Sequence, residues 1–139
     1  MPTLMFLNLP VEDLARSVAF YEALGYSTDP NFTGDESACV VISETIYVML
    51  VVRPYFQTYV STEVADATKV TEAMFGLGVD SREDVDTLVD KALAAGGSAA
   101  REPRDLGFMY NRTFLDPDGH YWDVFWMDPT AAQQGPPTE

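Results

Sequence analysis

Residues 114–126 read FLDPDGHYWDVFW, two stretches rich in aromatic residues that are joined by the segment Asp116-Pro-Asp-Gly119. Aspartate in the first position and proline in the second are typical of a type I turn, so this segment predicts a tight turn between two strands. One carboxylate, Asp123, lies among apolar neighbours just after the turn. The stretch therefore predicts a strand pair and raises the question of whether Asp123 binds a metal, binds an organic ligand or faces water.

The residues around this turn predict a strand, a helix and three further strands. Residues 72–79 are strand-like, and Ser81 with Asp84 resembles a capping box at a helix start. The helix ends at Gly96 and carries an apolar stripe at helical spacing, formed by Val85, Leu88, Val89, Ala92 and Leu93. The three strands that follow are predicted at residues 98–101, 107–115 and 121–127. The second half thus has the order βαβββ.

The first half of the chain repeats this order. Residues 4–11 are strand-like, and residues 12–24 combine helical apolar spacing with acids in the first turn and end before Gly25. Three more strands are predicted at residues 26–30, 38–42 and 46–52. A single helix covers one sheet face, so paired units leave a concavity between their open faces. The sequence predicts an α+β fold of two tandem βαβββ modules that form a cupped, mostly antiparallel sheet around a central cleft.

The repeat also predicts how the single domain is divided. Module 1 spans about residues 3–53, a linker about 54–71 and module 2 about 72–129. Residues 130–139 are expected to form a frayed tail. The linker aromatics are expected either to line the rim of the cleft or to pack on the sheets: Tyr55, Phe56 and Tyr59.

Composition limits the class of protein. A chain of 139 residues can bury a core that needs no disulfide or metal, and the single cysteine, Cys39, is expected to be a small buried hydrophobe. The formal charge of −14 opposes binding to nucleic acid and to anionic membranes, and no apolar run approaches the roughly 20 residues of a membrane span. The N-terminus has no signal-peptide pattern, so a cytoplasmic location is expected.

Two segments, one in each half, carry a family resemblance. Residues 8–21 read NLPVEDLARSVAFY, and residues 114–124 read FLDPDGHYWDV. In this order and spacing they resemble the vicinal oxygen chelate superfamily, which includes glyoxalase I, bleomycin-resistance proteins and extradiol dioxygenases. Three further segments resemble a bacterial lactoylglutathione lyase-like subgroup: residues 65–71, 79–86 and 107–119. The likeness covers about residues 4–129, implies the fold and leaves the reaction open, because unrelated chemistries share this fold.

The resemblance also implies a divalent metal, which His, Glu or Gln side chains usually hold on the first and last strands of each module. The corresponding positions here are Phe6, Val48 or Met49, Met74 and Asp123. A phenyl ring has no lone pair to donate, and a thioether is too soft for the metals expected here. The single histidine, His120, is expected to cap the turn on the face opposite Asp123. We therefore expect neither a metal nor another cofactor.

Alternation along the strands predicts the residues of the cleft. The expected ligand-binding residues on the face that lines the cleft are Phe6, Asn8, Met74, Gly76, Tyr121 and Phe125, and Asp123 is the candidate catalytic acid. Tyr110 and Arg112 are further ligand-binding candidates because they lie on or beside the strand before the turn. Asp123 is expected to pair with Arg112, to bind a cationic ligand or to face water. Residues of the opposite parity are expected to pack under the helices: Leu7, Leu9, Phe75, Leu77, Val79, Trp122 and Val124.

Three kinds of function fit these residues. The first is a metal-independent binding protein that holds a small organic molecule, aromatic or cationic, in the cleft between its modules. The alternative is a metal-dependent lyase, isomerase or dioxygenase with unconventional ligands, or an acid–base catalyst that uses Asp123. In the third, side chains fill the cleft and the protein acts through its surface. The resemblance further implies a homodimer.

Overall fold

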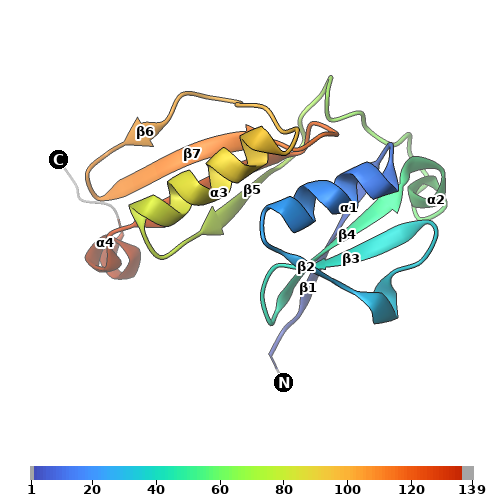
Figure 1. The fold of residues 1–139 in the computed structure, drawn as a ribbon, viewed down its shortest axis with the longest axis horizontal. Helices are drawn as coiled ribbons and strands as arrows, with labels where there is room; N and C mark the ends of the chain where they lie inside the picture. The colour runs from blue at the N-terminus through green and yellow to red at the C-terminus, as the bar shows by residue number, and fades with distance from the viewer. Residues whose placement is uncertain (1, 136–139) are drawn as a thin grey trace.

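The computed structural model describes residues 2–135, and its elements follow the order βαβββ twice (Figure 1). The first module contains β1 (Met5–Val11), α1 (Leu14–Ala23), β2 (Ser27–Asp29), β3 (Ser37–Val41) and β4 (Ile46–Val52). The second contains β5 (Met74–Gly78), α3 (Arg82–Ala94), β6 (Arg104–Asp105), β7 (Met109–Leu115) and β8 (Tyr121–Met127). Short helices complete the chain: η1 (Pro30–Phe32), α2 (Arg53–Gln57) and α4 (Pro129–Gln134). The predicted α+β fold of two tandem modules is confirmed.

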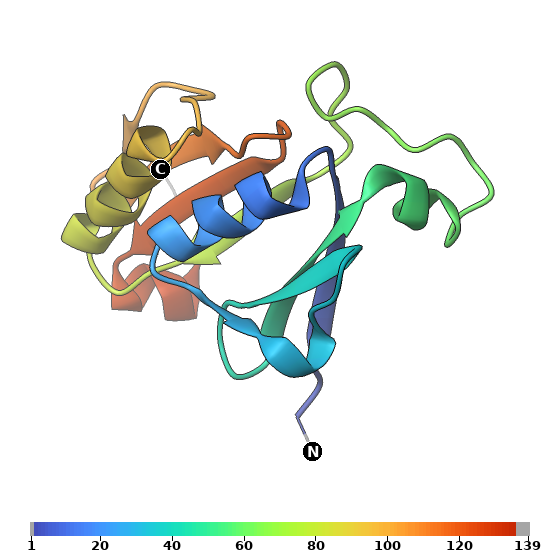
Figure 2. The same cartoon turned by 45° about the vertical axis from the view of Figure 1, so that its right-hand side comes forward.

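Each module forms its own four-stranded sheet, in the orders β1-β4-β3-β2 and β5-β8-β7-β6. The pairs β1–β4 and β5–β8 are parallel, and the other pairs are antiparallel. Figure 1 and Figure 2 show α1 lying across one face of the first sheet and α3 across one face of the second. The opposite face of each sheet, which we call its open face, has no long helix on it. The strands β1 and β5 each form one edge of their sheet, and β2 and β6 form the other.

Capping residues fix where the two long helices begin. The carboxylate of Asp13 accepts a hydrogen bond from Arg16 N at 3.1 Å, and the hydroxyl of Ser81 accepts one from Asp84 N at 3.0 Å. Each satisfies an amide that has no partner within its helix. The helix start predicted at Ser81 is confirmed.

Side chains from both modules form one core. Leu9, Trp122 and Val124 are buried on the helix-covered faces, as their parity predicts. From α1, Phe20 lies 5.9 Å from the ring of Phe114 and Tyr21 lies 6.2 Å from the ring of Trp122, measured between ring centroids. Helix α1 therefore packs on its own sheet and against the second module. Cys39 is fully buried, as expected.

A polar network also joins α1 to the turn between β7 and β8. The hydroxyl of Tyr21 donates to Asp116 Oδ2 at 2.6 Å and accepts from Trp122 Nε1 at 3.0 Å. Burial raises the pKa of Tyr21 well above its usual value, and burial also raises the pKa of Asp116. The carboxylate of Asp118 accepts bonds from the start of α1, including one from Ser17 Oγ at 3.0 Å. The predicted turn therefore also joins the second module to α1 of the first through hydrogen bonds.

Two local predictions were wrong. The strand expected at residues 98–101 is reduced to one bridge between Ser98 and Leu115, and β6 lies further along the chain. The tail expected to fray from residue 130 instead forms α4, because Asp128 accepts a bond from Thr130 N at 2.9 Å and Ala131 is buried. The remaining part of that prediction, residues 136–139, lies outside the described residues.

Candidate functional site

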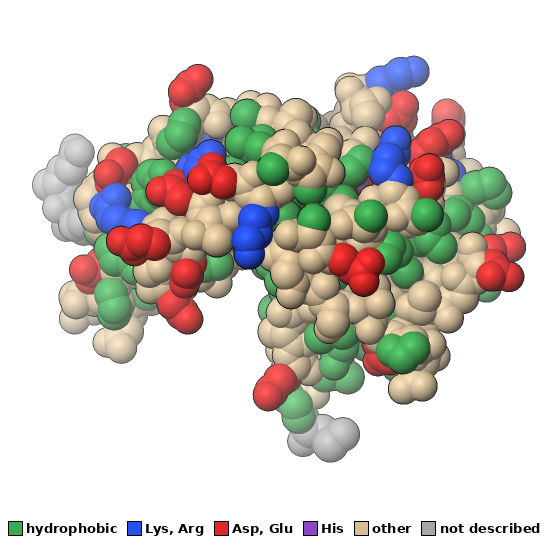
Figure 3. Space-filling view, in the orientation of Figure 1, with side chains coloured by type: hydrophobic (Ala, Val, Ile, Leu, Met, Phe, Trp, Pro, Cys, Tyr) green, Lys and Arg blue, Asp and Glu red, His purple; other side chains and the backbone are tan. Residues whose placement is uncertain are grey.

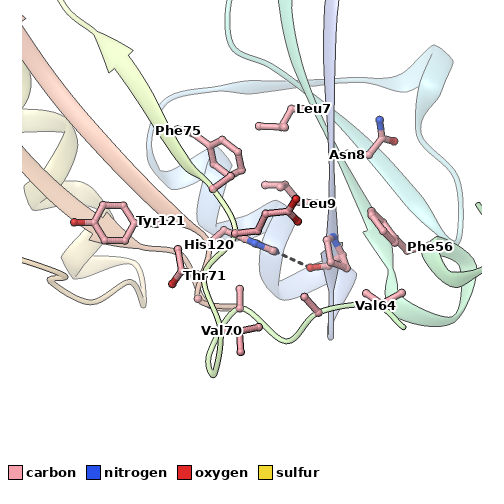
Figure 4. Close-up of a pocket in the computed structure, with 16 residues that line it drawn as sticks. Leu7, Asn8, Leu9, Phe56, Val64, Val70, Thr71, Phe75, His120 and Tyr121 are labelled. Carbon is pink, nitrogen blue, oxygen red and sulfur yellow. Dashed lines mark hydrogen bonds between the residues drawn. The ribbon is translucent and has the colours of Figure 1, made fainter. Parts of the chain in front are cut away.

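An apolar pocket of about 260 Å³ lies between the edge strands of the two modules (Figure 4). Its inner walls come from Leu7 and Leu9 on β1 and Phe75 on β5. The segment of residues 64–73 and the ring of Phe56 form much of the remaining lining. The pocket exists because β1 and β5 do not pair with each other, so the gap between the sheets is closed by the linker.

Two features hold the linker over the pocket. The guanidinium of Arg53 donates to the carbonyl oxygens of Val64 and Ala65, each at 3.0 Å. Gly119, which has a φ of +89°, lies directly beneath Ala67, and a Cβ at this glycine would be 2.9 Å from Ala67 backbone atoms. A glycine at the β7–β8 turn is therefore required both by its backbone conformation and by the close approach of the linker.

Only a few polar groups reach the pocket: Asn8, Thr71, Glu72, His120 and Tyr121. His120 is largely buried, and its Nε2 lies 2.8 Å from Pro10 O. A carbonyl oxygen only accepts, so Nε2 donates in this contact, which is drawn as a dashed line in Figure 4. The expected capping role of His120 thus takes the form of a bond between the modules.

The electrostatic character of the pocket is mildly acidic. Glu72 is its one carboxylate, and none of its described lining residues is Lys or Arg. Over the face of the molecule seen in Figure 3, acidic side chains are spread rather than gathered at one place. The formal charge of −14 therefore acts as a general field that disfavours anionic ligands.

The pocket contains two of the predicted ligand-binding residues, Asn8 and Tyr121. Phe6 does not line it and instead stacks on Tyr47 on the open face of the first sheet, with ring centroids 4.7 Å apart. The other predicted residues with the parity of Asp123 lie on the open face of the second sheet, also outside the pocket lining: Met74, Gly76, Asp123 and Phe125.

Tyr110 and Arg112 lie neither in the pocket nor on the open face of the second sheet. Tyr110 Oη donates to Asp86 Oδ1 at 2.6 Å, and Arg112 Nη1 donates to Asp86 at 3.0 Å and to Asp90 at 2.9 Å. Both side chains therefore lie under α3, on the face opposite Asp123, and the expected pair of Asp123 with Arg112 is not formed. The bond from Tyr110, followed by that from Arg112, lowers the pKa of Asp86.

The residue between them, Asn111, does reach Asp123. Its Nδ2 donates to Asp123 Oδ1 at 2.8 Å, and the side chain is only 3% exposed. Phe114 is buried on the helix-covered face, and strict alternation along β7 therefore places Asn111 on the open face. The contact between Asn111 and Asp123 could thus have been predicted from alternation along the strand.

Phe56, which was expected either at the rim of the cleft or packed on the sheets, lines the pocket. Glu72 was not expected there, because the path of the linker has no local signal. Leu7, Leu9 and Phe75, which were expected to pack under the helices, also line the pocket.

The side chains at the family's metal positions do not fit a divalent ion. Phe6 and Met74 are exposed apolar side chains, Met49 is half-buried on β4, and Val48 is buried in the core. Among residues 2–135, no three His, Cys, Asp or Glu side chains come together in an arrangement that holds a metal. One carboxylate and one amide at Asp123 fall well short of the donor number that such ions take.

Comparisons with known proteins agree with this architecture. A family model for the N-terminal part of bleomycin-resistance-like proteins matches residues 3–43. The chain is similar to the hypothetical protein SA1046 from S. aureus, with 33% identity, coverage of 91% of this chain and 95% of that one, and a TM-score of 0.77. This chain belongs to the vicinal oxygen chelate superfamily.

Two further solved structures share its fold at lower identity. A glyoxalase/bleomycin resistance protein/dioxygenase family enzyme from Burkholderia phytofirmans has 18% identity and a TM-score of 0.74, with 91% of this chain and 99% of that chain covered. The fosfomycin resistance protein FosX from Mesorhizobium loti has 16% identity and a TM-score of 0.69, with 96% and 98% covered. No curated protein matches the chain. In the described residues, no helix combines the length and apolar character needed to cross a membrane.

Proposed function

We propose that this member of the vicinal oxygen chelate superfamily binds a small, mostly apolar organic molecule between its modules without the help of a metal ion. The observation that carries the proposal is the apolar pocket between β1 and β5, closed by the linker. Small-molecule sites are typically concave and apolar, with a few polar groups that orient the ligand. Asn8, Glu72 and Tyr121 supply such groups here.

The pocket also limits the kind of ligand. Its volume of about 260 Å³ is just below the range of roughly 300–1,000 Å³ that is typical of ligand sites, which favours a small molecule with one or two rings. Glu72 and the absence of Lys and Arg from the described lining favour a neutral or cationic molecule. The donor set at the family's metal positions supports a site that works without a metal.

A pocket-filling substitution tests the proposal. Ala73 lines the pocket and is exposed, so Ala73→Trp introduces an indole without disturbing the core. Aromatic amines and alcohols are screened by thermal shift, since a ligand of the folded state raises stability according to its concentration and Kd. We expect hits for the natural sequence that Ala73→Trp abolishes and Ala94→Trp, on the exposed end of α3, retains. Hits that survive Ala73→Trp would place the ligand elsewhere and contradict the proposal.

We also propose that the protein is a homodimer. The open faces carry large exposed apolar side chains, among them Phe6 at 42%, Phe32 at 56% and Met74 at 61% exposure. A second copy would cover such side chains, and the unpaired edges β1 and β5 offer backbone groups to it. Light scattering after size exclusion is expected to give twice the chain mass at micromolar concentration. A monomer, or a dimer that Phe6→Glu leaves unchanged, would contradict this arrangement.

A further inference from the structure

The open face of the second sheet carries one half-buried carboxylate. Asp123 on β8 lies beside Gly76 on β5 and Thr113 on β7. Its neighbours along the same face of β8 are the aromatic side chains of Tyr121 and Phe125. Such a carboxylate loses part of its hydration and needs a partner. Within residues 2–135, the hydrogen bond from Asn111 is the one that its carboxylate receives.

Asn111 is an unusual partner because it donates a hydrogen bond to Asp123 while its own side-chain oxygen is left without one in the described part of the chain. Its Nδ2 donates to Asp123 Oδ1 at 2.8 Å, while its own Oδ1 is buried and has no hydrogen-bond partner among the described residues. Turning the amide over would bring two oxygens together, so the donor must face the carboxylate. A buried acceptor without a partner costs stability. The arrangement fixes the orientation of the Asp123 carboxylate and leaves Oδ2 without a bond from the described chain.

The surface beside this carboxylate is apolar and open. A Cβ at Gly76 would be 3.4 Å from the ring of Phe125, and one at Gly78 would be 3.2 Å from it. The ring of Phe125 therefore lies over the two glycines and forms an aromatic surface near Asp123. An aromatic face near a carboxylate suits an organic cation, which pairs its charge with the acid and places its carbon atoms on the ring.

We propose that Asp123, oriented by Asn111, binds an organic cation such as a primary ammonium group at the place where relatives are expected to hold a metal ion. A divalent ion needs several oxygen or nitrogen donors, whereas an ammonium group needs one carboxylate and tolerates apolar neighbours. This site goes beyond the proposed pocket, because Asp123 and Phe125 do not line that pocket. The acidic field of the chain raises the local concentration of cations.

The test compares two probes of matched shape, benzylammonium and benzyl alcohol, in titrations followed by amide NMR. Benzylammonium is expected to shift the signals of Gly76, Asp123 and Phe125 and the side-chain amide of Asn111, and benzyl alcohol to leave them nearly unchanged. Asp123→Asn should weaken benzylammonium binding about tenfold, because the charge-assisted bond is lost. The matched control is Asp90→Asn, which removes an equal charge from an exposed position on α3 and should bind as the natural protein does.

Asn111 is a positioning residue, so its substitution should change selectivity rather than folding. Asn111→Leu removes the unsatisfied oxygen and is expected to fold, to bind benzylammonium severalfold more weakly and to lower the preference for amine over alcohol. Asn111→Ser supplies a second variant if the leucine disturbs the sheet. Equal binding of both probes, or equal binding by the Asp123→Asn and Asp90→Asn variants, would overturn the proposal.

A titration with Mn²⁺ tests the competing hypothesis, that Asp123 binds a metal ion. Mn²⁺ that broadens the signals of Gly76 and Asp123 selectively, and no longer does so in Asp123→Asn, would identify Asp123 as a metal ligand and overturn the proposal. Broadening spread over the acidic surface would support it. These results are independent of the pocket between the modules, which Ala73→Trp tests separately.

Discussion

The two modules share one topology but present different chemistry at equivalent positions. In the first module Asn8 on β1 lies beside Met49 on β4, and in the second Gly76 on β5 lies beside Asp123 on β8. The first open face carries the stacked rings of Phe6 and Tyr47, whereas the second has two exposed glycines and an acid beside the ring of Phe125. The backbone repeat therefore fixes where side chains lie, and the side chains alone decide what the surface binds.

The largest effect should come from the glycine that the second module requires. Gly119→Ala combines a positive φ with a Cβ 2.9 Å from backbone atoms of Ala67. The conformation costs about 1–2 kcal/mol, and the clash adds about 1–3 kcal/mol. Gly25, just past the end of α1 in the first module, has a φ of +104°, but a Cβ there would meet nothing within 4 Å, so Gly25→Ala should lose only the conformational contribution. Urea unfolding measures the free energy of unfolding of both variants. Equal losses of stability would show that the close approach of the linker to Gly119 has no energetic effect.

A smaller effect should follow from the hydroxyl of Tyr21. Tyr21→Phe leaves Trp122 Nε1 and one oxygen of Asp116 without their buried partner, which should destabilise the fold by about 1–3 kcal/mol. Tyr110→Phe removes a bond of the same 2.6 Å length to the more exposed Asp86 and should cost about 0.5–1 kcal/mol. Denaturant midpoints compare the two variants. The reverse order would contradict the role assigned to the α1 network.

The smallest effect should be present near neutral pH and lost in acid. Bonds from Arg82 and then from Gly107 N lower the pKa of Asp105 to about 2. A carboxyl whose folded pKa is depressed stabilises the protein above its unfolded pKa, and this contribution fades as the pH falls from about 4 to about 2. Asp105→Asn should therefore lower Tm slightly at pH 6 and by less at pH 2, where the carboxyl of the folded protein is already partly protonated. If the Tm difference between the variant and the natural protein is the same at both pH values, the lost contacts of the side chain, and not its titration, cause the effect.

Local patterns in the sequence predict most of the fold. The predicted strand 121–127 has the observed bounds of β8, and Ser81 caps α3 as predicted. Tyr110 and Arg112 were assigned to the cleft because they lie near the turn, although alternation with the buried Phe114 places them under α3. Side-chain periodicity is therefore a better guide to the site than distance along the chain.

The position and lining of the pocket could not be predicted from the sequence for a different reason. Both depend on the gap between β1 and β5 and on the path of the linker, which are set by contacts between distant residues such as Arg53 with Val64 and Gly119 with Ala67. None of these contacts has a short-range pattern. The orphaned oxygen of Asn111 is likewise visible only once the strands are packed.

Native mass spectrometry of the protein purified without chelator or affinity tag tests the central claim most directly. We predict a species whose extra mass is that of an organic molecule, with substoichiometric metal, and loss of this molecule in Ala73→Trp. One metal ion per chain that disappears in Asp123→Asn would contradict the account and return the protein to the metal-dependent members of its superfamily.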